Sequence, residues 1–125
     1  MSGLTLDAGA LIAFERNDRK TVALLARALE VGFSISVPAG VVGQAWRDGR
    51  RQARLARLLG SAQVEIEALD DRRAREAGQL CGVKGVPDVI DASVVLCALR
   101  RGHRVVTSDP GDIRKLDAKL PLIAV

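Results

Sequence analysis

The amino-acid sequence predicts an α/β domain with a central, mainly parallel sheet and helices on both faces, a three-layer α/β/α arrangement. Short apolar segments alternate with longer segments in which apolar residues recur at helical spacing. The 125 residues have the length of one domain, so we expect residues 1–125 to form a single folded unit. Hydrophobic residues make up 48% of the chain and aromatic residues only 2%, which leaves Val, Leu, Ile and Ala to build the core.

The first half of the chain is expected to contain three strands and four helices. Strands are predicted from β-branched or alternating residues at 4–6, 34–37 and 64–67. Helices are predicted from apolar spacing and from capping and proline signals at 7–13, 21–30, 38–46 and 55–59. Asp7 can cap the first of these helices. The alternation from Val64 to Glu67 predicts a strand with one face in water.

The second half continues the same alternation. Helices are expected at 71–80, at 87–101 and from 109 onward, and strands at 104–107 and 120–125. Asp70 or Asp71 can cap the first of these helices, a loop is expected at 82–85, and Gly102 ends the apolar helix that begins at Pro87. Strands that alternate with helices are typical of a parallel sheet.

Composition and charge restrict the function. The net charge of +4 comes mostly from arginine, which suits bidentate contacts with phosphate. With so few aromatic residues, nucleic-acid binding would depend on phosphate contacts and metal rather than on base stacking. The fully apolar runs are far shorter than the roughly 18 residues of a membrane span, and no basic-then-apolar leader opens the chain, so we expect a cytoplasmic protein. Cys81 and Cys97 have no metal-ligand spacing and are expected to be reduced and buried.

Aspartates are placed where the strands of such a sheet end. Asp7 directly follows the first strand, and Asp109 follows the strand at 104–107. Asp88 and Asp91 lie three residues apart in the first turn of the apolar helix, which places both on one helix face. Because ligands in open α/β sheets bind beyond the carboxyl ends of the strands, we expect these carboxylates to share one cleft.

Each of these aspartates also has a purely structural explanation. Asp7 and Asp109 can be helix N-caps, and Asp88 can simply complement a helix dipole. Asp91 is harder to explain in this way, because it begins an apolar segment beside which an unpaired carboxylate would be costly. A hard divalent cation would relieve repulsion among the acids, and oxygen ligands favour Mg²⁺ or Mn²⁺ over zinc.

A carboxylate-held cation of this kind supports phosphodiester hydrolysis by a water that the metal activates. Motifs of other α/β enzymes are missing, because the chain has no GxGxxG turn, no GxxxxGK[ST] loop and no GxSxG elbow. An aspartyl phosphotransferase built on Asp7 would need a mid-chain acceptor strand and a late lysine, an order that is not seen. The lone His103 follows the helix stop at Gly102 and is expected to be a solvated turn residue rather than a catalytic base.

The order of these motifs resembles that of PIN-domain ribonuclease toxins, the VapC family of bacterial toxin–antitoxin pairs. The resemblance extends over nearly the whole chain and rests on Leu6-Asp7-Ala8, Asp91-Ala92 and the segment 105–109. The segment 107–113 is similar to the mycobacterial and actinobacterial members. The resemblance implies a PIN-like fold and a Mg²⁺-dependent endoribonuclease that a cognate VapB-like antitoxin inhibits, usually as a homodimer. It assigns Asp7, Asp91 and Asp109 to the metal, with Asp88 and Asp112 as further acids of the site.

The chain departs from the family pattern at one position. The family commonly carries a glutamate in the helix after the second strand, where this chain aligns Gln44. Glutamine supplies no charge, so the site has one acid fewer, and a second metal is put in doubt. This departure keeps a second hypothesis open, a non-enzymatic PIN-like module that binds RNA or an antitoxin.

A final candidate feature is a series of arginines, Arg47, Arg50, Arg54 and Arg57, at spacings of three or four. If the helix continues past Gly49, they form one basic stripe. Such a stripe can bind the RNA backbone, can contact an acidic antitoxin, or can be an ordinary solvated helix face.

Overall fold

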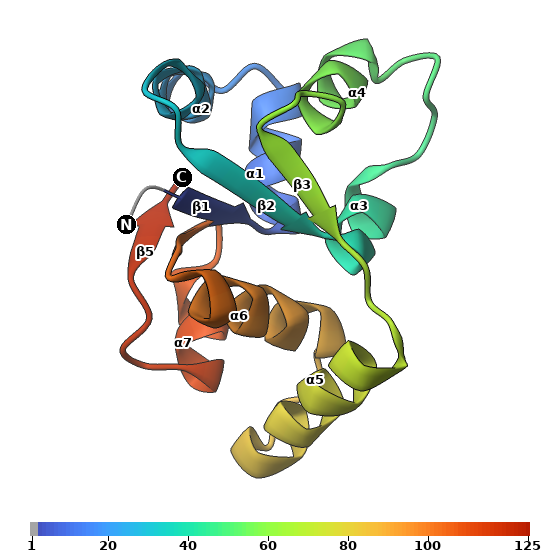
Figure 1. Ribbon diagram of the computed structural model, residues 1–125, viewed down its shortest axis with the longest axis vertical. Coiled ribbons are helices and arrows are strands. Elements are labelled where there is room, and N and C mark those ends of the chain that lie inside the picture. Colours follow the sequence, from blue (N-terminus) through green and yellow to red (C-terminus); the bar gives the residue numbers. More distant parts are fainter. Residues whose placement is uncertain (1–2) are drawn as a thin grey trace.

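The computed structural model describes residues 3–125, in which five strands alternate with seven helices (Figure 1). The strands are β1 (Gly3–Leu6), β2 (Ser34–Pro38), β3 (Val64–Glu67), β4 (Arg104–Thr107) and β5 (Leu122–Ala124). The helices are α1 (Ala8–Glu15), α2 (Arg19–Glu30), α3 (Ala39–Ala45), α4 (Ala53–Leu59), α5 (Asp71–Lys84), α6 (Val89–Arg101) and α7 (Pro110–Leu116). The predicted order of strands and helices is therefore confirmed.

The five strands form one parallel sheet in the order β3-β2-β1-β4-β5. Thr5 of β1 pairs with Ser36 on one side and with Val105 on the other, so the first strand lies at the centre of the sheet. Because all five strands point the same way, their carboxyl ends share one edge. The residues that follow β1 and β4 are thereby brought together there.

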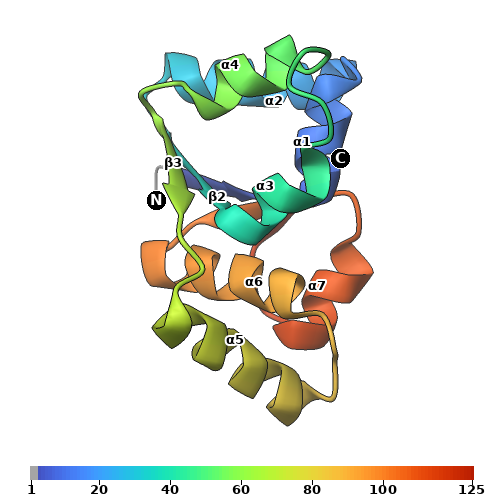
Figure 2. The ribbon, with the colours of Figure 1, turned by 90° about the vertical axis from the view of Figure 1, so that its right-hand side faces the viewer.

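Helices cover both faces of this sheet, as predicted. Helices α1, α2 and α4 lie on one side of it and α5, α6 and α7 on the other (Figure 2). Helix α6 packs directly on the sheet, and Ala92, Val94 and Val95 are fully buried there. The long apolar run of α6 therefore forms the centre of one half of the core. Cys81 and Cys97 are buried and free, as expected.

Several predicted boundaries need correction. Helix α5 does not stop at Leu80 but continues through the expected loop to Lys84, where Gly85 ends it with a left-handed backbone (φ 67°). Helix α6 begins at Val89, and Pro87 lies outside it, since the cap is Asp88. No helix among residues 3–125 combines the length and the apolar character needed to cross a bilayer.

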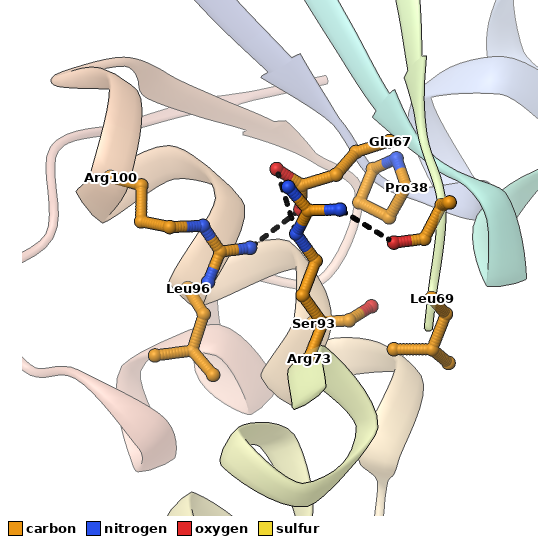
Figure 3. Close-up of a pocket in the computed structure, with 8 residues that line it drawn as sticks. Pro38, Glu67, Leu69, Arg73, Ser93, Leu96 and Arg100 are labelled. Carbon is orange, nitrogen blue, oxygen red and sulfur yellow. Dashed lines mark hydrogen bonds and ion pairs between the residues drawn. The ribbon is translucent and has the colours of Figure 1, made fainter. Parts of the chain in front are cut away.

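Strand β3 follows the predicted wet face at Glu65, which is exposed, but departs from it in the next two residues. Glu67 is buried, whereas Ile66 remains 41% exposed. The carboxylate of Glu67 lies 2.6 Å from Nη2 of Arg100 and 3.8 Å from Nε of Arg73 (Figure 3). It also lies 3.4 Å from Nη2 of Arg101. These arginines come from α5 and α6, which lie in the layer below β3. The ion pairs of Glu67 thus link the edge strand β3 to helices α5 and α6.

His103 is buried, so the expectation of a solvated turn residue is wrong. Its Nδ1 lies 3.0 Å from Oγ1 of Thr5 and 3.2 Å from Oγ of Ser36, both inside the sheet. Gly3 makes room for the ring, because a Cβ at that position would overlap it. Burial, followed by the charge of Arg101, lowers the pKa of the imidazole. His103 immediately precedes β4 and therefore lies at the amino edge of the sheet, away from the aspartates.

Candidate metal centre

Asp7 connects the end of β1 to the start of α1. Its Oδ1 accepts a hydrogen bond from the backbone N–H of Ala10 at 2.9 Å, so it is the N-cap of α1. The residue is only 7% exposed, and burial raises the pKa of its carboxyl group. The nearby carboxylate of Asp109 also raises this pKa, whereas hydrogen bonds from Thr107, Ala10 and Gly9 lower it. Asp7 is therefore a buried acid that no cation among residues 3–125 pairs with.

Asp109 and Asp112 follow β4 at the same edge. Asp109 is the N-cap of α7, and its Oδ1 accepts from the N–H of Asp112 at 3.3 Å. Its own N–H donates to Oγ1 of Thr107 at 2.9 Å, which fixes the turn that leaves the strand. Asp112 lies in the first turn of α7, where Lys115 is within 3.5 Å of its carboxylate. Thr107 thus orients both acids that flank it in space, Asp7 and Asp109.

Asp88 and Asp91 come from the third segment, the start of α6. Asp88 caps the helix by accepting from the N–H of Asp91 at 2.9 Å. Burial raises the pKa of Asp91 to about 6, and the carboxylates of Asp88, Asp7 and Asp112 contribute to the rise. Carboxylates from all three segments therefore act on the pKa of Asp91.

The structural and functional readings of these acids are compatible. The expected helix caps are present at Asp7 and Asp109, and Asp88, which was expected only to complement a helix dipole, is a cap as well; each uses Oδ1 for the cap. The cap hydrogen bonds therefore occupy one oxygen of each carboxylate, and Thr107 is a further hydrogen-bond partner of Asp7. Across residues 3–125, however, no three Asp, Glu, His or Cys side chains are grouped closely enough to hold a metal ion in their present rotamers. Like charges that have no cation between them repel one another, which opposes such a grouping.

The donor set nevertheless fits a hard divalent cation. Every acid of the cluster is an aspartate, and carboxylate oxygens are the ligands that Mg²⁺ and Mn²⁺ prefer. These aspartates differ from buried Glu67 in their ion pairs. Among the described residues, Glu67 has three arginine partners, whereas Asp7, Asp91 and Asp109 have none. A cation at this position would replace the missing positive charge.

Gly9 is a site residue that the sequence did not single out. It lies in the first turn of α1, and a Cβ there would overlap the side chain of Ser108. Gly9 therefore allows the loop after β4 to approach Asp7 closely. A glycine two residues after a strand-end acid is a weak signal on its own, because glycines are common in such turns.

Two further sequence predictions concern the segment after β2. Gln44 is exposed near the end of α3, and its alignment with the family's glutamate stays a prediction. The arginine stripe does not exist as one helix face, because α3 ends at Ala45 and α4 begins only at Ala53. Arg47 and Arg50 lie in the loop between these helices, and Arg54 and Arg57 lie on α4.

Comparisons with known proteins agree with this architecture. The toxin–antitoxin complex VapBC2 from Rickettsia felis, solved on a promoter DNA fragment, includes a chain that is 16% identical, with a TM-score of 0.71 and 98% of both chains covered. VapC20 of Mycobacterium tuberculosis, a toxin that cleaves the sarcin–ricin loop, is 15% identical, with a TM-score of 0.66 over 98% of this chain and 99% of that one. A chain of VapBC-1 from nontypeable Haemophilus influenzae is 14% identical, with a TM-score of 0.69 over 98% of this chain and 97% of that one.

At these identities the structural matches establish the fold alone. A search of curated protein sequences gave no match. Residues 4–119, by contrast, match the PIN domain family at the level of sequence. The matched segment contains β1 and β4 and every aspartate of the cluster, Asp7, Asp88, Asp91, Asp109 and Asp112. The chain therefore belongs to the PIN domain family, and its fold resembles that of the VapC toxins.

Proposed function

We propose that the protein is a metal-dependent endoribonuclease and the toxin of a type II toxin–antitoxin pair, acting in the cytoplasm. The observation that carries this proposal is the convergence of aspartates from three chain segments on one sheet edge, where Asp7, Asp91 and Asp109 have no Lys or Arg partner among residues 3–125 and Lys115 pairs with Asp112 alone. Burial is the main cause of the raised pKa of Asp91, and the carboxylates of Asp88, Asp7 and Asp112 add to it, which agrees with this convergence. The closer similarity of segment 107–113 to mycobacterial and actinobacterial toxins remains a prediction.

Asp7, Asp91 and Asp109 are the residues that would hold Mg²⁺ or Mn²⁺. The chemistry that such a cation supplies when bound is activation of water and neutralisation of charge on the scissile phosphate. Thr107 holds Asp7 and Asp109 in place through its hydroxyl group. Burial, and then the neighbouring carboxylates, raise the pKa of Asp91 to about 6, so binding of a cation there would release a proton chiefly below about pH 6. Asp88 and Asp112 extend the negative surface around these three.

The first test is cleavage of total RNA by the purified protein with Mg²⁺, with EDTA, and with EDTA followed by excess Mg²⁺. We expect cleavage with Mg²⁺, none with EDTA, and recovery on adding the metal back. An Asp109→Asn protein purified in the same way controls for contaminating ribonucleases. Binding of RNA without cleavage under every metal condition would instead support the second hypothesis, a PIN-like binding module.

An antitoxin is the protein partner that this proposal implies. An apolar groove of about 390 Å³ lies between α2 and α4, with Leu25, Leu29 and Leu58 in its lining. Arg54 and Arg57 also line it, so the groove suits an amphipathic segment that carries acidic residues. A homodimer is expected from the family resemblance alone, and light scattering of the purified chain would test it.

Gln44→Glu tests the missing acid of the family pattern. If Gln44 turns toward the aspartates, the added carboxylate should lower the Mg²⁺ or Mn²⁺ concentration for half-maximal cleavage, because it adds a hard anionic ligand. The metal-free variant should melt at a lower temperature at neutral pH and regain stability as acid protonates the cluster. Metal titration and thermal melting would measure the two effects. If neither changes, Gln44 lies away from the site, and Glu15 or Asp48 becomes the next residue to test.

A further inference from the structure

The excess positive charge of the protein is concentrated in one short segment. Residues 47–57 contain five arginines and one aspartate, a net charge of +4, which equals the formal net charge of the whole chain. The positive and negative charges of the remaining residues are therefore equal in number. All five arginines are exposed. Three of them, Arg47, Arg50 and Arg51, lie in residues 46–51, which we term the arginine loop.

Gln52 holds the arginine loop in a defined conformation. Its side chain is buried, and its Oε1 accepts from the backbone N–H groups of Arg47 at 2.8 Å and Asp48 at 2.9 Å. Its Nε2 donates to the carbonyl of Ala45 at 2.9 Å and to Oε1 of Glu15 at 3.2 Å. Both donors and both acceptor positions of the amide are thus used. These hydrogen bonds close the loop across its base and join that base to Glu15, the last residue of α1; the loop itself forms the outer connection between α3 and α4 (Figure 1).

The loop arginines are only weakly neutralised within the protein. Nη1 of Arg47 donates to two backbone carbonyls, those of Gly43 at 3.0 Å and Trp46 at 2.7 Å. These contacts orient the guanidinium group without cancelling its charge. Arg50 and Arg51 share the single carboxylate of Asp48 at 3.4 and 3.9 Å, with side chains that are 92% and 88% exposed. Such exposed pairs are easily exchanged for another anion.

We propose that the arginine loop, folded by Gln52, binds the phosphate backbone of an RNA substrate. This inference rests on the proposed ribonuclease function. Guanidinium groups bind phosphate in a bidentate manner, and an exposed polycation favours a polyanion. Trp46, 37% exposed, is the single apolar side chain of the loop, and the apolar groove between α2 and α4 includes Arg54 and Arg57 but no residue of the loop. A protein partner would need a larger apolar anchor than this, and the competition experiment below separates it from RNA.

The position of the loop fits a substrate that extends away from the cleavage site. Asp7 caps one end of α1, and Glu15, which contacts Gln52, is the last residue at the other end. Eight helical residues span about 12 Å, or about three to four nucleotides of a strand at about 3.4 Å each. The loop therefore binds the RNA a few nucleotides away from the scissile bond. Gln52 is a positioning residue, because it acts by holding the arginine loop in place.

The test is RNA binding in EDTA, where nothing is cut, measured by fluorescence anisotropy with a labelled single-stranded oligonucleotide over a range of salt. The triple variant Arg47→Gln, Arg50→Gln, Arg51→Gln should reduce the slope of log K against log salt by about 2, at about 0.7 per lost phosphate contact. Gln52→Ala keeps every charge but should weaken binding roughly tenfold, because binding must then order the loop. Circular dichroism and thermal melting would establish that both variants are folded.

Matched controls are Gln63→Ala, which removes an amide that donates to the carbonyl of Phe33, and the pair Arg72→Gln with Arg75→Gln on α5. Both should leave RNA affinity within about twofold. With Mg²⁺ present, the loop variants should raise KM more than they lower kcat. An unchanged salt slope in the triple variant, or equal competition by poly-glutamate and RNA, would overturn the inference and assign the loop to an acidic protein. If the slope changes in a protein that cuts no RNA, the loop inference stands and the ribonuclease proposal falls.

Discussion

Asp91→Asn should abolish metal-dependent RNA cleavage and at the same time stabilise the metal-free protein. Loss of a direct metal ligand should lower the rate by about 10²-fold or more, since even residues that merely support a ligand cost about 10- to 100-fold. Asp7→Asn should behave in the same way for activity, and it keeps the α1 cap, because asparagine caps helices as well as aspartate does.

The stabilisation by Asp91→Asn should depend on pH with a definite sign. The pKa of Asp91 is about 6 in the folded protein, above its ordinary value of 3.8. Between these values the folded state binds more protons than the unfolded state, so the metal-free protein loses stability as pH rises from about 4 to about 6. Asparagine removes that loss, and we expect a gain of about 1 to 2 kcal/mol at pH 7, after allowing for solvent screening, and almost none near pH 4.

Urea unfolding in EDTA at pH 4, 5, 6 and 7 would measure this difference. Asp71→Asn is the matched control, because Asp71 is exposed on α5 and, among residues 3–125, pairs only with Arg75. The Asp71→Asn protein should still cleave RNA, and its stability relative to the unmodified protein should not change with pH in this way. Full cleavage by Asp91→Asn would remove this residue from the site, and equal stability of both proteins at every pH would show that the acids do not repel.

Glu67→Gln should cause the largest loss of stability among single charge changes in this chain. The substitution keeps the shape of the side chain but leaves Arg73, Arg100 and Arg101 without their shared buried carboxylate. Breaking a fully buried pair costs about 3 to 5 kcal/mol, and partial exposure of the arginines lets water recover some of it, so we expect about 2 to 3 kcal/mol.

Denaturant unfolding of the two proteins would provide the measurement. Glu30→Gln serves as the control, because Glu30 pairs with Arg27 on the surface, with side chains 71% and 70% exposed. It should change stability by less than about 0.5 kcal/mol. If Glu67→Gln were as stable as the unmodified protein, the three arginines would not depend on this acid.

The sequence predicted those features that local pattern and sheet geometry determine. Alternating apolar segments gave the order of the elements, and the rule that parallel strands end at one edge brought Asp7 and Asp109 together. The helix boundaries were less accurate where glycine is tolerated inside a helix. Helix α5 continues through Gly82, because its buried face, which includes Ala77 and Cys81, packs against α6.

The errors at Glu67 and His103 depend on contacts between residues far apart in the chain. Glu67 alternates with apolar residues as an exposed side chain would, but arginines from α5 and α6 neutralise it and allow its burial. His103 is polar and follows a helix stop, yet hydroxyl groups of Thr5 and Ser36 satisfy it inside the sheet. The break between α3 and α4 depends on one glutamine amide that pairs with four groups. No local pattern announces such partners.

The central place of β1 in the sheet has a consequence for synthesis on the ribosome. Leu4 of β1 pairs with Arg104 of β4, about one hundred residues later in the chain. At a synthesis rate of about 5 to 20 residues per second, the edge of β1 that pairs with β4 stays unpaired for roughly 5 to 20 seconds. During this interval Asp7 has no Asp109 beside it, although the first three strands can already pair. Under the proposed ribonuclease function, the nascent chain therefore lacks part of its aspartate cluster until residues 109–112 emerge, after which only the end of α7 and β5 remain to be added.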